Sequence, residues 1–226
     1  MQLTTTEFSK EKIREIIAKR VAKEFKDGDV VTLGIGLPTE AANYVPQSVN
    51  VIFQSENGLL GAGKNQTKEP FDTRITNAGG VCVEIKEGAC FYDTQMAFSM
   101  MRGGHIDVTV LGALQVDQEG NIASWLIPGK LVPGIGGAMD LVVGSKKVIV
   151  AMEHTSKDSV KIVKKCDLPL TGANEVDLII TERCVLEVTE DGLLLTEINP
   201  AFSVEDIKQS VTADIEVSQN LKLMEL

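Results

Sequence analysis

The stretch best suited to chemistry is 55–58, Ser-Glu-Asn-Gly, which sets one carboxylate among short polar side chains. It follows the apolar run 49–53, which predicts a buried strand. Ligands of open α/β sheets bind outside the carboxyl ends of the strands. Gly58 can adopt positive φ in a tight turn, which would aim Glu56 at a ligand. Glu56 is therefore a candidate for acting on a substrate, and the alternative is a strand-to-turn junction with a solvated glutamate.

Two glycine-rich segments could hold a ligand through their backbone. The first, 34–40, Gly-Ile-Gly-Leu-Pro-Thr-Glu, follows a short β-rich run, and its N–H groups could face an anion at the start of a helix. It lacks the third glycine of the dinucleotide fingerprint. The second, 133–140, Pro-Gly-Ile-Gly-Gly-Ala-Met-Asp, could offer the N–H donors that an oxyanion needs. For both, a purely structural turn is the alternative.

The elements around these stretches alternate between helix and strand. Apolar residues at helical spacing predict a helix over 9–26, with Ser9 as its N-cap and Gly28 as its stop. Further helices are expected over 91–101 and from Ser203, and strands over 29–33, 81–85, 106–111, 146–152, 178–180, 185–188, 193–195 and 215–217. Residues 61–74 are predicted to be a surface loop, possible as a lid. This order favours an α/β fold, in which helices flank a mostly parallel sheet, with 1–226 as a single domain.

Composition limits the classes of partner and compartment. The chain has 226 residues and a net charge of −10, which argues against nucleic acid or an anionic membrane as a partner. No apolar run reaches the ~18 residues of a membrane helix, and the first residues do not resemble a signal peptide. A cytoplasmic protein is expected. The four cysteines are predicted to be reduced and mostly buried, and their spacing, with two histidines, does not predict a metal site.

Residues 53–61, Phe-Gln-Ser-Glu-Asn-Gly-Leu-Leu-Gly, resemble the active-site signature of the β subunit of family I coenzyme A transferases, the 3-oxoacid or acetoacetate type. The resemblance extends from about Asp29 to the C-terminus. It includes, in the family's order, segments 77–79, 98–105, 127–130, 134–141, 152–154 and 168–172. The family's CoA-transferase fold agrees with the α/β fold expected from the pattern of elements.

The resemblance also implies roles for individual residues. It makes Glu56 the covalent nucleophile, positioned by Ser55 and Asn57. The remaining expected residues either support an oxyanion or contact the coenzyme: Gly136, Gly137 and Ala138 for the first role, and Gly34, Gly36, Gly137 and Lys157 for the second.

The implied reaction moves coenzyme A between short carboxylic acids such as acetoacetate, acetate, butyrate and succinate. A coenzyme A thioester is then a substrate, and no permanently bound cofactor is expected. A protein carboxylate can form an acyl-glutamyl anhydride and then a glutamyl-CoA thioester, which divides one difficult exchange into easier steps. The family also implies an α subunit, with an α₂β₂ assembly as the expected form.

Three alternatives stay open. An acyl-CoA hydrolase would use the same glutamate and admit water. A sugar-phosphate isomerase-like enzyme would use the glycine loops for phosphate. A non-catalytic binding or scaffold subunit would leave the chemistry to its partner. His105 is read as a structural histidine because no orienting partner stands at recognisable spacing, and its role in catalysis is left open.

Overall fold

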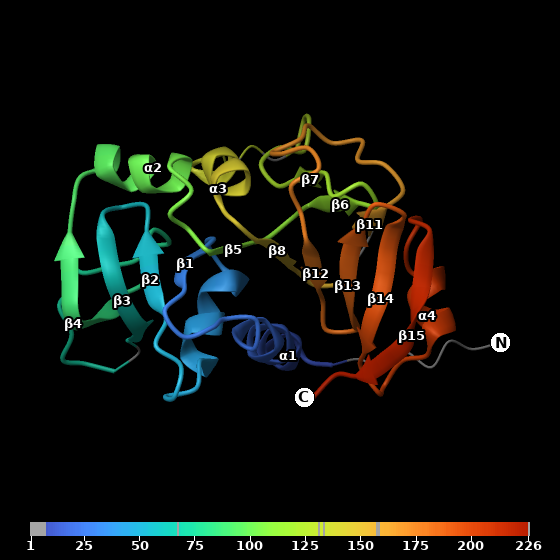
Figure 1. Cartoon of the computed structure of the whole chain (residues 1–226), viewed down its shortest axis with the longest axis horizontal. Coiled ribbons are helices and arrows are strands. Elements are labelled where there is room, and N and C mark those ends of the chain that lie inside the picture. The colour runs from blue at the N-terminus through green and yellow to red at the C-terminus, as the bar shows by residue number, and fades with distance from the viewer. Residues whose placement is uncertain (1–7, 67, 131, 133, 157–158, 226) are drawn as a thin grey trace.

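A computed structural model describes residues 8–66, 68–130, 132, 134–156 and 159–225. Its main sheet has ten strands in the order β15-β14-β13-β12-β8-β5-β1-β2-β3-β4 (Figure 1). Five neighbouring strands at its centre are parallel to one another: β2 (Ile52–Ser55), β1 (Val30–Leu33), β5 (Val108–Leu111), β8 (Val148–Ala151) and β12 (Leu178–Ile180). Their carboxyl ends therefore lie at one edge of the sheet, which is where the site is expected.

Both flanks of the sheet contain antiparallel pairs. On one flank β2 pairs with β3 (Leu59–Asn65), and β3 pairs with β4 (Val83–Phe91). On the other, β12, β13 (Cys184–Thr189) and β14 (Gly192–Ile198) are successively antiparallel, and β15 (Ile215–Leu223) runs parallel to β14. The hairpin predicted near residues 189–192 is confirmed, and the single continuous sheet supports treating the chain as one domain.

The loop predicted over 61–74 is wrong at its start, because β3 continues to Asn65. The glycines that suggested a loop instead permit close strand approach. A Cβ built on Gly61 would lie 2.8 Å from the Cβ of Ala89, and one built on Gly63 would lie 2.8 Å from the Cβ of Glu84. Glycine inside a strand is typical of such close backbone approach.

Helices cover both faces of the sheet. The helix α1 (Lys10–Ala22) and the 3₁₀ helix η1 (Leu37–Tyr44) share one buried apolar cluster with the central strands. The second cluster includes side chains of α2 (Thr94–Arg102), α3 (Ala138–Gly144) and α4 (Val204–Gln209). It also includes residues from some of the short strands that form two small sheets: β6 (Gln115–Asp117), β7 (Ile122–Ala123), β9 (Thr155–Ser156), β10 (Ser159–Val160) and β11 (Ile162–Val163).

Local capping explains where several helices begin. Ser9 accepts a hydrogen bond from the Lys12 N–H, and Ser203 forms a reciprocal capping box with Asp206, so both predicted N-caps are confirmed. The first helix ends at Ala22, earlier than the predicted Lys26, and α3 was not predicted at all.

The thiols are free, as expected, but only Cys184 is buried and Cys90 is exposed, so the prediction of mostly buried cysteines is wrong.

Candidate active site

Glu56 lies on the tight turn that joins β2 to β3, at the carboxyl end of β2. The Gly58 N–H donates to the Ser55 carbonyl at 3.0 Å and closes the turn. Gly58 has φ +107°, and a Cβ there would overlap the Tyr92 carbonyl oxygen. Only glycine suits this position. The turn leaves the Glu56 side chain half-exposed at the sheet edge where parallel strands end.

The Glu56 carboxylate packs against the glycine segment that precedes α3. A Cβ built on Gly136 would lie 3.9 Å from Oε1 of Glu56, and one on Gly137 would overlap Oε2. The same Gly137 position is 3.3 Å from Cζ of Phe98. A carboxylate can therefore approach the backbone here more closely than any other residue type at 137 would allow. The structure brings together Glu56, Gly136 and Gly137, as predicted.

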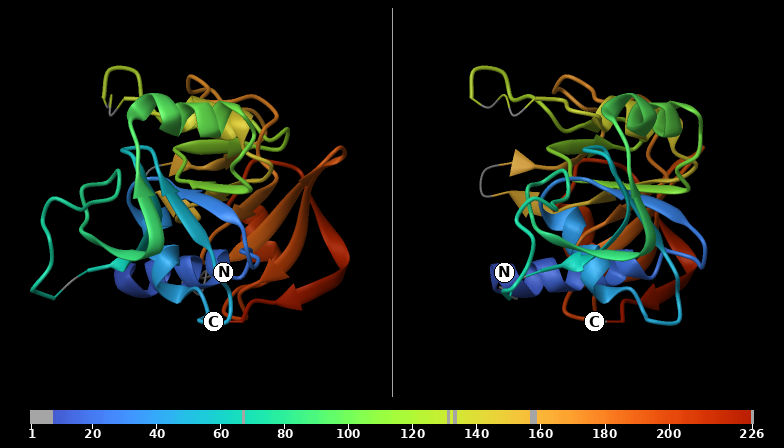
Figure 2. Two further views of the ribbon diagram at one scale, coloured as in Figure 1. Left: turned by 60° about the vertical axis from the view of Figure 1, so that its left-hand side comes forward. Right: turned by 90° about the vertical axis from the view of Figure 1, so that its left-hand side faces the viewer.

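The glycine segment is fixed in place by a contact between α2 and α3, which lie side by side (Figures 1 and 2). Nε of Arg102 donates to Oδ1 of Asp140 at 2.6 Å, and the Arg102 guanidinium lies 5.5 Å from the Phe98 ring centroid. Asp140 belongs to the first turn of α3, directly after the glycines. These contacts set the position of the backbone that Glu56 meets.

The other predicted neighbours of Glu56 have defined partners. The Ser55 hydroxyl accepts a hydrogen bond from the Ala78 N–H at 3.0 Å, and the Asn57 amide donates to the Thr76 carbonyl at 2.8 Å. The Ala138 N–H donates to the Ile135 carbonyl at 3.1 Å. Ser55 and Asn57 thus anchor the turn on both sides of Glu56.

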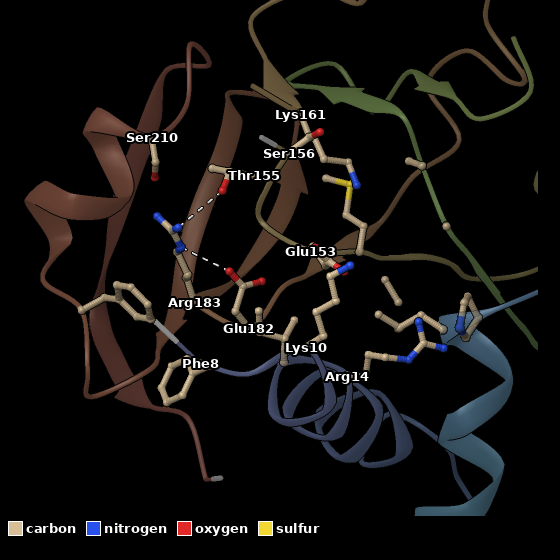
Figure 3. A pocket seen from close by; sticks show the side chains of 18 of the residues that line it. Phe8, Lys10, Arg14, Glu153, Thr155, Ser156, Lys161, Glu182, Arg183 and Ser210 are labelled. Carbon is tan, nitrogen blue, oxygen red and sulfur yellow. Dashed lines mark hydrogen bonds and ion pairs between the residues drawn. The ribbon is translucent and has the colours of Figure 1, made fainter. Parts of the chain in front are cut away.

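A cavity of about 950 Å³ opens at the same sheet edge (Figure 3). Residues that follow β1, β5, β8 and β12 line it, together with the start of α1 and the region of α4. Ile35 lines the cavity and also lies beside Gly79, where an added Cβ would be 3.4 Å from Ile35 Cγ2. Residue 79 follows Ala78, the partner of Ser55. The cavity is thereby linked to the Glu56 turn through one short chain of contacts.

The cavity carries charges of both signs. Its basic lining side chains are Lys10, Arg14, Lys161 and Arg183, and its acidic ones are Glu153, Glu182 and Asp206. Figure 3 shows most of them around one space, with Arg183 bonded to Glu182 and Thr155. Arg14 is held by Glu40 at 2.6 Å. Such a mixed lining can bind an anion through individual cations even though the whole chain is acidic.

Burial shifts the acid–base behaviour at the cavity floor. Burial raises the pKa of Glu182, against the effect of its backbone hydrogen bonds and the Arg183 charge. Burial lowers the pKa of Lys161, against Glu153 and Glu182. Burial also lowers the pKa of His154 to about 3, helped by the charges of Arg183 and Lys161. The neutral His154 ring contacts Thr181 Oγ1 at 3.0 Å and Ser210 Oγ at 2.9 Å.

The residues predicted to contact the coenzyme are placed differently from one another. Gly34 is wedged between strands, and its N–H donates to the Val110 carbonyl at 2.7 Å, so that donor is already used. Gly36 is exposed with φ +91°, between two residues that line the cavity. Lys157 lies outside the described residues, directly after the cavity-lining Ser156. His105 is exposed, beyond the end of α2 and outside the cavity lining.

Sequence reasoning missed the cavity's buried acid, Glu182. Residues 181–183, Thr-Glu-Arg, follow the apolar strand β12. This is the same signal that singled out residues 55–57 after β2, so the rule for carboxyl ends of strands would have found it. Lys10, Lys161 and Arg183 come from distant parts of the sequence and carry no shared local signal.

Within the described residues, no group of three or more His, Cys, Asp or Glu side chains is arranged to hold a metal ion. Among the same residues, none of the helices has the length and apolar character needed to cross a bilayer.

Comparison with known proteins identifies the family. Residues 14–210 match the family Coenzyme A transferase. The chain is 49% identical to the beta subunit of acetate CoA-transferase of Haemophilus influenzae, over 94% of this chain and 96% of that protein. It is 47% identical to the corresponding subunit of the succinyl-CoA:3-ketoacid coenzyme A transferase of Helicobacter pylori, over 91% and 99%.

Solved structures agree with this. A crystal structure of the acyl-CoA transferase YdiF from Escherichia coli O157:H7, described as a thioester complex with CoA, superimposes with a TM-score of 0.75. It is 25% identical, and the match covers 99% of this chain but only 44% of the YdiF chain. The predicted CoA-transferase fold is confirmed. The chain belongs to the coenzyme A transferase family of enzymes, in which it is of the β-subunit type.

Proposed function

We propose that this chain is the catalytic β subunit of a short-chain acyl-CoA:carboxylate CoA-transferase, with Glu56 as nucleophile. The observation that carries the proposal is the contact of the half-exposed Glu56 carboxylate with the backbone at Gly136 and Gly137. A nucleophile needs an accessible oxygen, and the oxyanion that it creates needs preorganised donors nearby.

The reaction proceeds by exchange at two carbonyl groups. The Glu56 carboxylate attacks the acyl-CoA carbonyl, the C–S bond breaks, and the thiolate leaves an acyl-glutamyl anhydride. The thiolate then attacks the glutamyl carbonyl, which releases the first acid as a carboxylate and forms a glutamyl-CoA thioester. A second carboxylate reverses these steps. One backbone donor to each tetrahedral oxyanion contributes roughly 3 kcal/mol, a role we assign to the segment of Gly136, Gly137 and Ala138.

The charged cavity is the proposed position of the coenzyme's phosphates. Lys10, Lys161 and Arg183 line it, and Gly36 and Lys157 stand at its margin in sequence. The YdiF structure, a thioester complex with CoA, supports a coenzyme A thioester as substrate. Because the Gly34 N–H is bonded to Val110, Gly34 would contribute close packing rather than a donor.

An α subunit is the proposed partner, in an α₂β₂ assembly. The relatives from Haemophilus influenzae and Helicobacter pylori are named as subunits, and the YdiF chain is more than twice as long as the matched part. Large apolar side chains on the elements around Glu56 are 50–67% exposed: Ile35, Phe91, Met96, Met139 and Val143. Exposed apolar clusters mark interaction surfaces. A partner that covers them would also shield the anhydride from water.

The acids are proposed from the names of the relatives, acetate and succinyl-CoA with a 3-ketoacid. Acetoacetate and butyrate belong to the same short-chain class. One methylene in a pocket changes binding by only ~1–3 kcal/mol, so closely related acids would all react to some extent. A cytoplasmic location and the lack of a permanent cofactor stay predictions.

The test is coexpression with an α-type subunit, followed by assay of acetoacetyl-CoA with acetate as acceptor. We expect parallel-line double-reciprocal plots, and no transfer for Glu56→Ala. Rapid loss of thioester without an acceptor acid would instead identify a hydrolase. Full transfer by the Glu56→Ala complex would refute the nucleophile assignment and favour a non-catalytic subunit.

A further inference from the structure

Residues 77–81 form a small loop that is organised around one side chain. Oδ1 of Asn77 accepts hydrogen bonds from the Gly79 N–H at 3.0 Å and the Val81 N–H at 3.1 Å. The Asn77 N–H donates to the Val81 carbonyl at 2.9 Å, and the Gly80 N–H donates to the Asn77 carbonyl at 2.9 Å. An asparagine that bonds N–H groups two and four positions ahead fixes the backbone of the residues between.

The fixed loop contacts both residues that flank Glu56. The N–H of Ala78 lies inside the loop and donates to the Ser55 hydroxyl at 3.0 Å. The carbonyl of Thr76, just before the loop, accepts from the Asn57 amide at 2.8 Å. The turn of Glu56 is therefore held from one side by two hydrogen bonds, whose partners adjoin Asn77.

The loop also lies between the turn and the cavity. Gly79 is packed so that an added Cβ would be 3.3 Å from Oδ1 of Asn77 and 3.4 Å from the Ile35 side chain. Ile35 lines the cavity proposed to hold the coenzyme. A single asparagine thus fixes a loop that separates, and spaces, the nucleophile and the bound thioester.

We propose that Asn77 is a positioning residue for Glu56, a role that rests on the proposed function of Glu56. It acts through Ser55 and Asn57 and sets the direction of the carboxylate relative to Gly137. Misplacement of a reacting group by about 1 Å can reduce a rate about 100-fold. The expected effect of losing the Asn77 acceptor is therefore on the chemical steps, while binding of acyl-CoA is little changed.

The experiment compares three variants in the coexpressed complex. Asn77→Ala removes the acceptor, and Asn77→Asp keeps an acceptor oxygen at the Oδ1 position. Asp72→Ala is the matched control, because Oδ1 of Asp72 accepts from the Arg74 N–H at 2.9 Å in an exposed turn that touches neither Ser55 nor Asn57. Each is measured for Tm, for kcat and KM, and for the rate of Glu56 thioester formation in a single turnover at pH 8.

We expect Asn77→Ala to lower kcat and the single-turnover rate by about 10- to 100-fold, with KM for acyl-CoA within about twofold. Asn77→Asp should recover at least about a third of the wild-type kcat, and Asp72→Ala should match wild type. Equal kcat for Asn77→Ala and wild type would overturn the proposal, as would an Asn77→Asp protein no better than Asn77→Ala.

Two further variants separate the possible failures. If Asn77→Ala does not fold, Asn57→Ala breaks one link from an exposed position and should lower kcat in the same way. Unchanged kcat for it would count against the proposal. Glu56→Ala is run in parallel. Activity of Glu56→Ala defeats the proposed function itself, whereas an inactive Glu56→Ala beside a fully active Asn77→Ala defeats only the positioning role.

Discussion

Two glutamates follow parallel strands at the same edge of the sheet, yet their surroundings differ. Glu56, after β2, is half-exposed and lies against the backbone of glycines. Glu182, after β12, is 4% exposed. Glu182 accepts hydrogen bonds from the His154 N–H at 2.8 Å and from Nε of Arg183 at 3.2 Å.

The difference teaches what makes a carboxylate available for attack. Hydrogen bonds and a paired guanidinium occupy the oxygens of Glu182, and burial penalises its charge. The oxygens of Glu56 instead face backbone at which donors could stabilise a developing charge. The same position relative to a strand thus serves structure in one case and, as we propose, catalysis in the other.

The largest predicted effect comes from exchanging each glutamate for its isosteric amide. Glu56→Gln should lower transfer by at least about a thousandfold, because an amide cannot form the anhydride. Glu182→Gln should retain transfer within about tenfold. Steady-state assays of the two coexpressed complexes decide this, and a Glu182→Gln enzyme more damaged than Glu56→Gln would reverse the assignment of roles.

The next effect concerns the glycine backbone. Gly137→Ala introduces a Cβ that overlaps Oε2 of Glu56, so the carboxylate must move and kcat should fall about 100-fold. Gly88→Ala is the control. Gly88 has φ +80° in β4, with no atom within 4 Å of an added Cβ. That variant should lose about 1 kcal/mol of stability and keep its activity. Equal activity of both would show that the Glu56 contact has no role in catalysis.

A smaller effect is the pH dependence of stability due to Glu182. Burial raises its folded-state pKa, so its contribution is present below the unfolded value of about 4.3 and is lost as pH rises through the folded pKa. Glu182→Gln removes this loss. Its free energy of unfolding relative to wild type should rise with pH, by about 1.4 kcal/mol for each pH unit that separates the folded pKa from the unfolded one. Denaturation from pH 4.5 to 8 measures the difference, and a difference independent of pH would contradict a raised pKa.

The smallest effect is spectroscopic. Burial holds the pKa of His154 at about 3, so its ring should stay neutral from pH 8 down to pH 5. Because this pKa is below the unfolded value of about 6.5, stability from His154 is present above pH 6.5 and is lost as pH falls toward 3. NMR of ring-labelled protein checks this, and a titration of His154 near pH 6.5 would contradict the buried environment.

Local signals predicted much of the fold. Ser9 and Ser203 cap helices because their hydroxyls satisfy backbone N–H groups nearby, and such interactions are visible in sequence. β3 was missed because Gly61 and Gly63 look like loop residues until their tertiary neighbours are known. Helix α3 was missed because it follows glycines and is only seven residues long.

The site was predictable only in part. Glu56 and Gly137 could be named from their motifs, and the structure places them in contact. The cavity could not be named, because Lys161 and Arg183 meet only through strand order and carry no local signal. Tertiary arrangement, rather than motif, determines which charges face one space.

The most direct test of the central claim is chemical trapping at Glu56. The chain is coexpressed with its α-type partner, incubated with acetoacetyl-CoA and treated with borohydride, and the peptides are mapped by mass. We expect reduction of the Glu56 side chain to an alcohol, because a glutamyl-CoA thioester is present before treatment. An unmodified Glu56 in a fully active complex would contradict the nucleophile assignment and place the chemistry elsewhere.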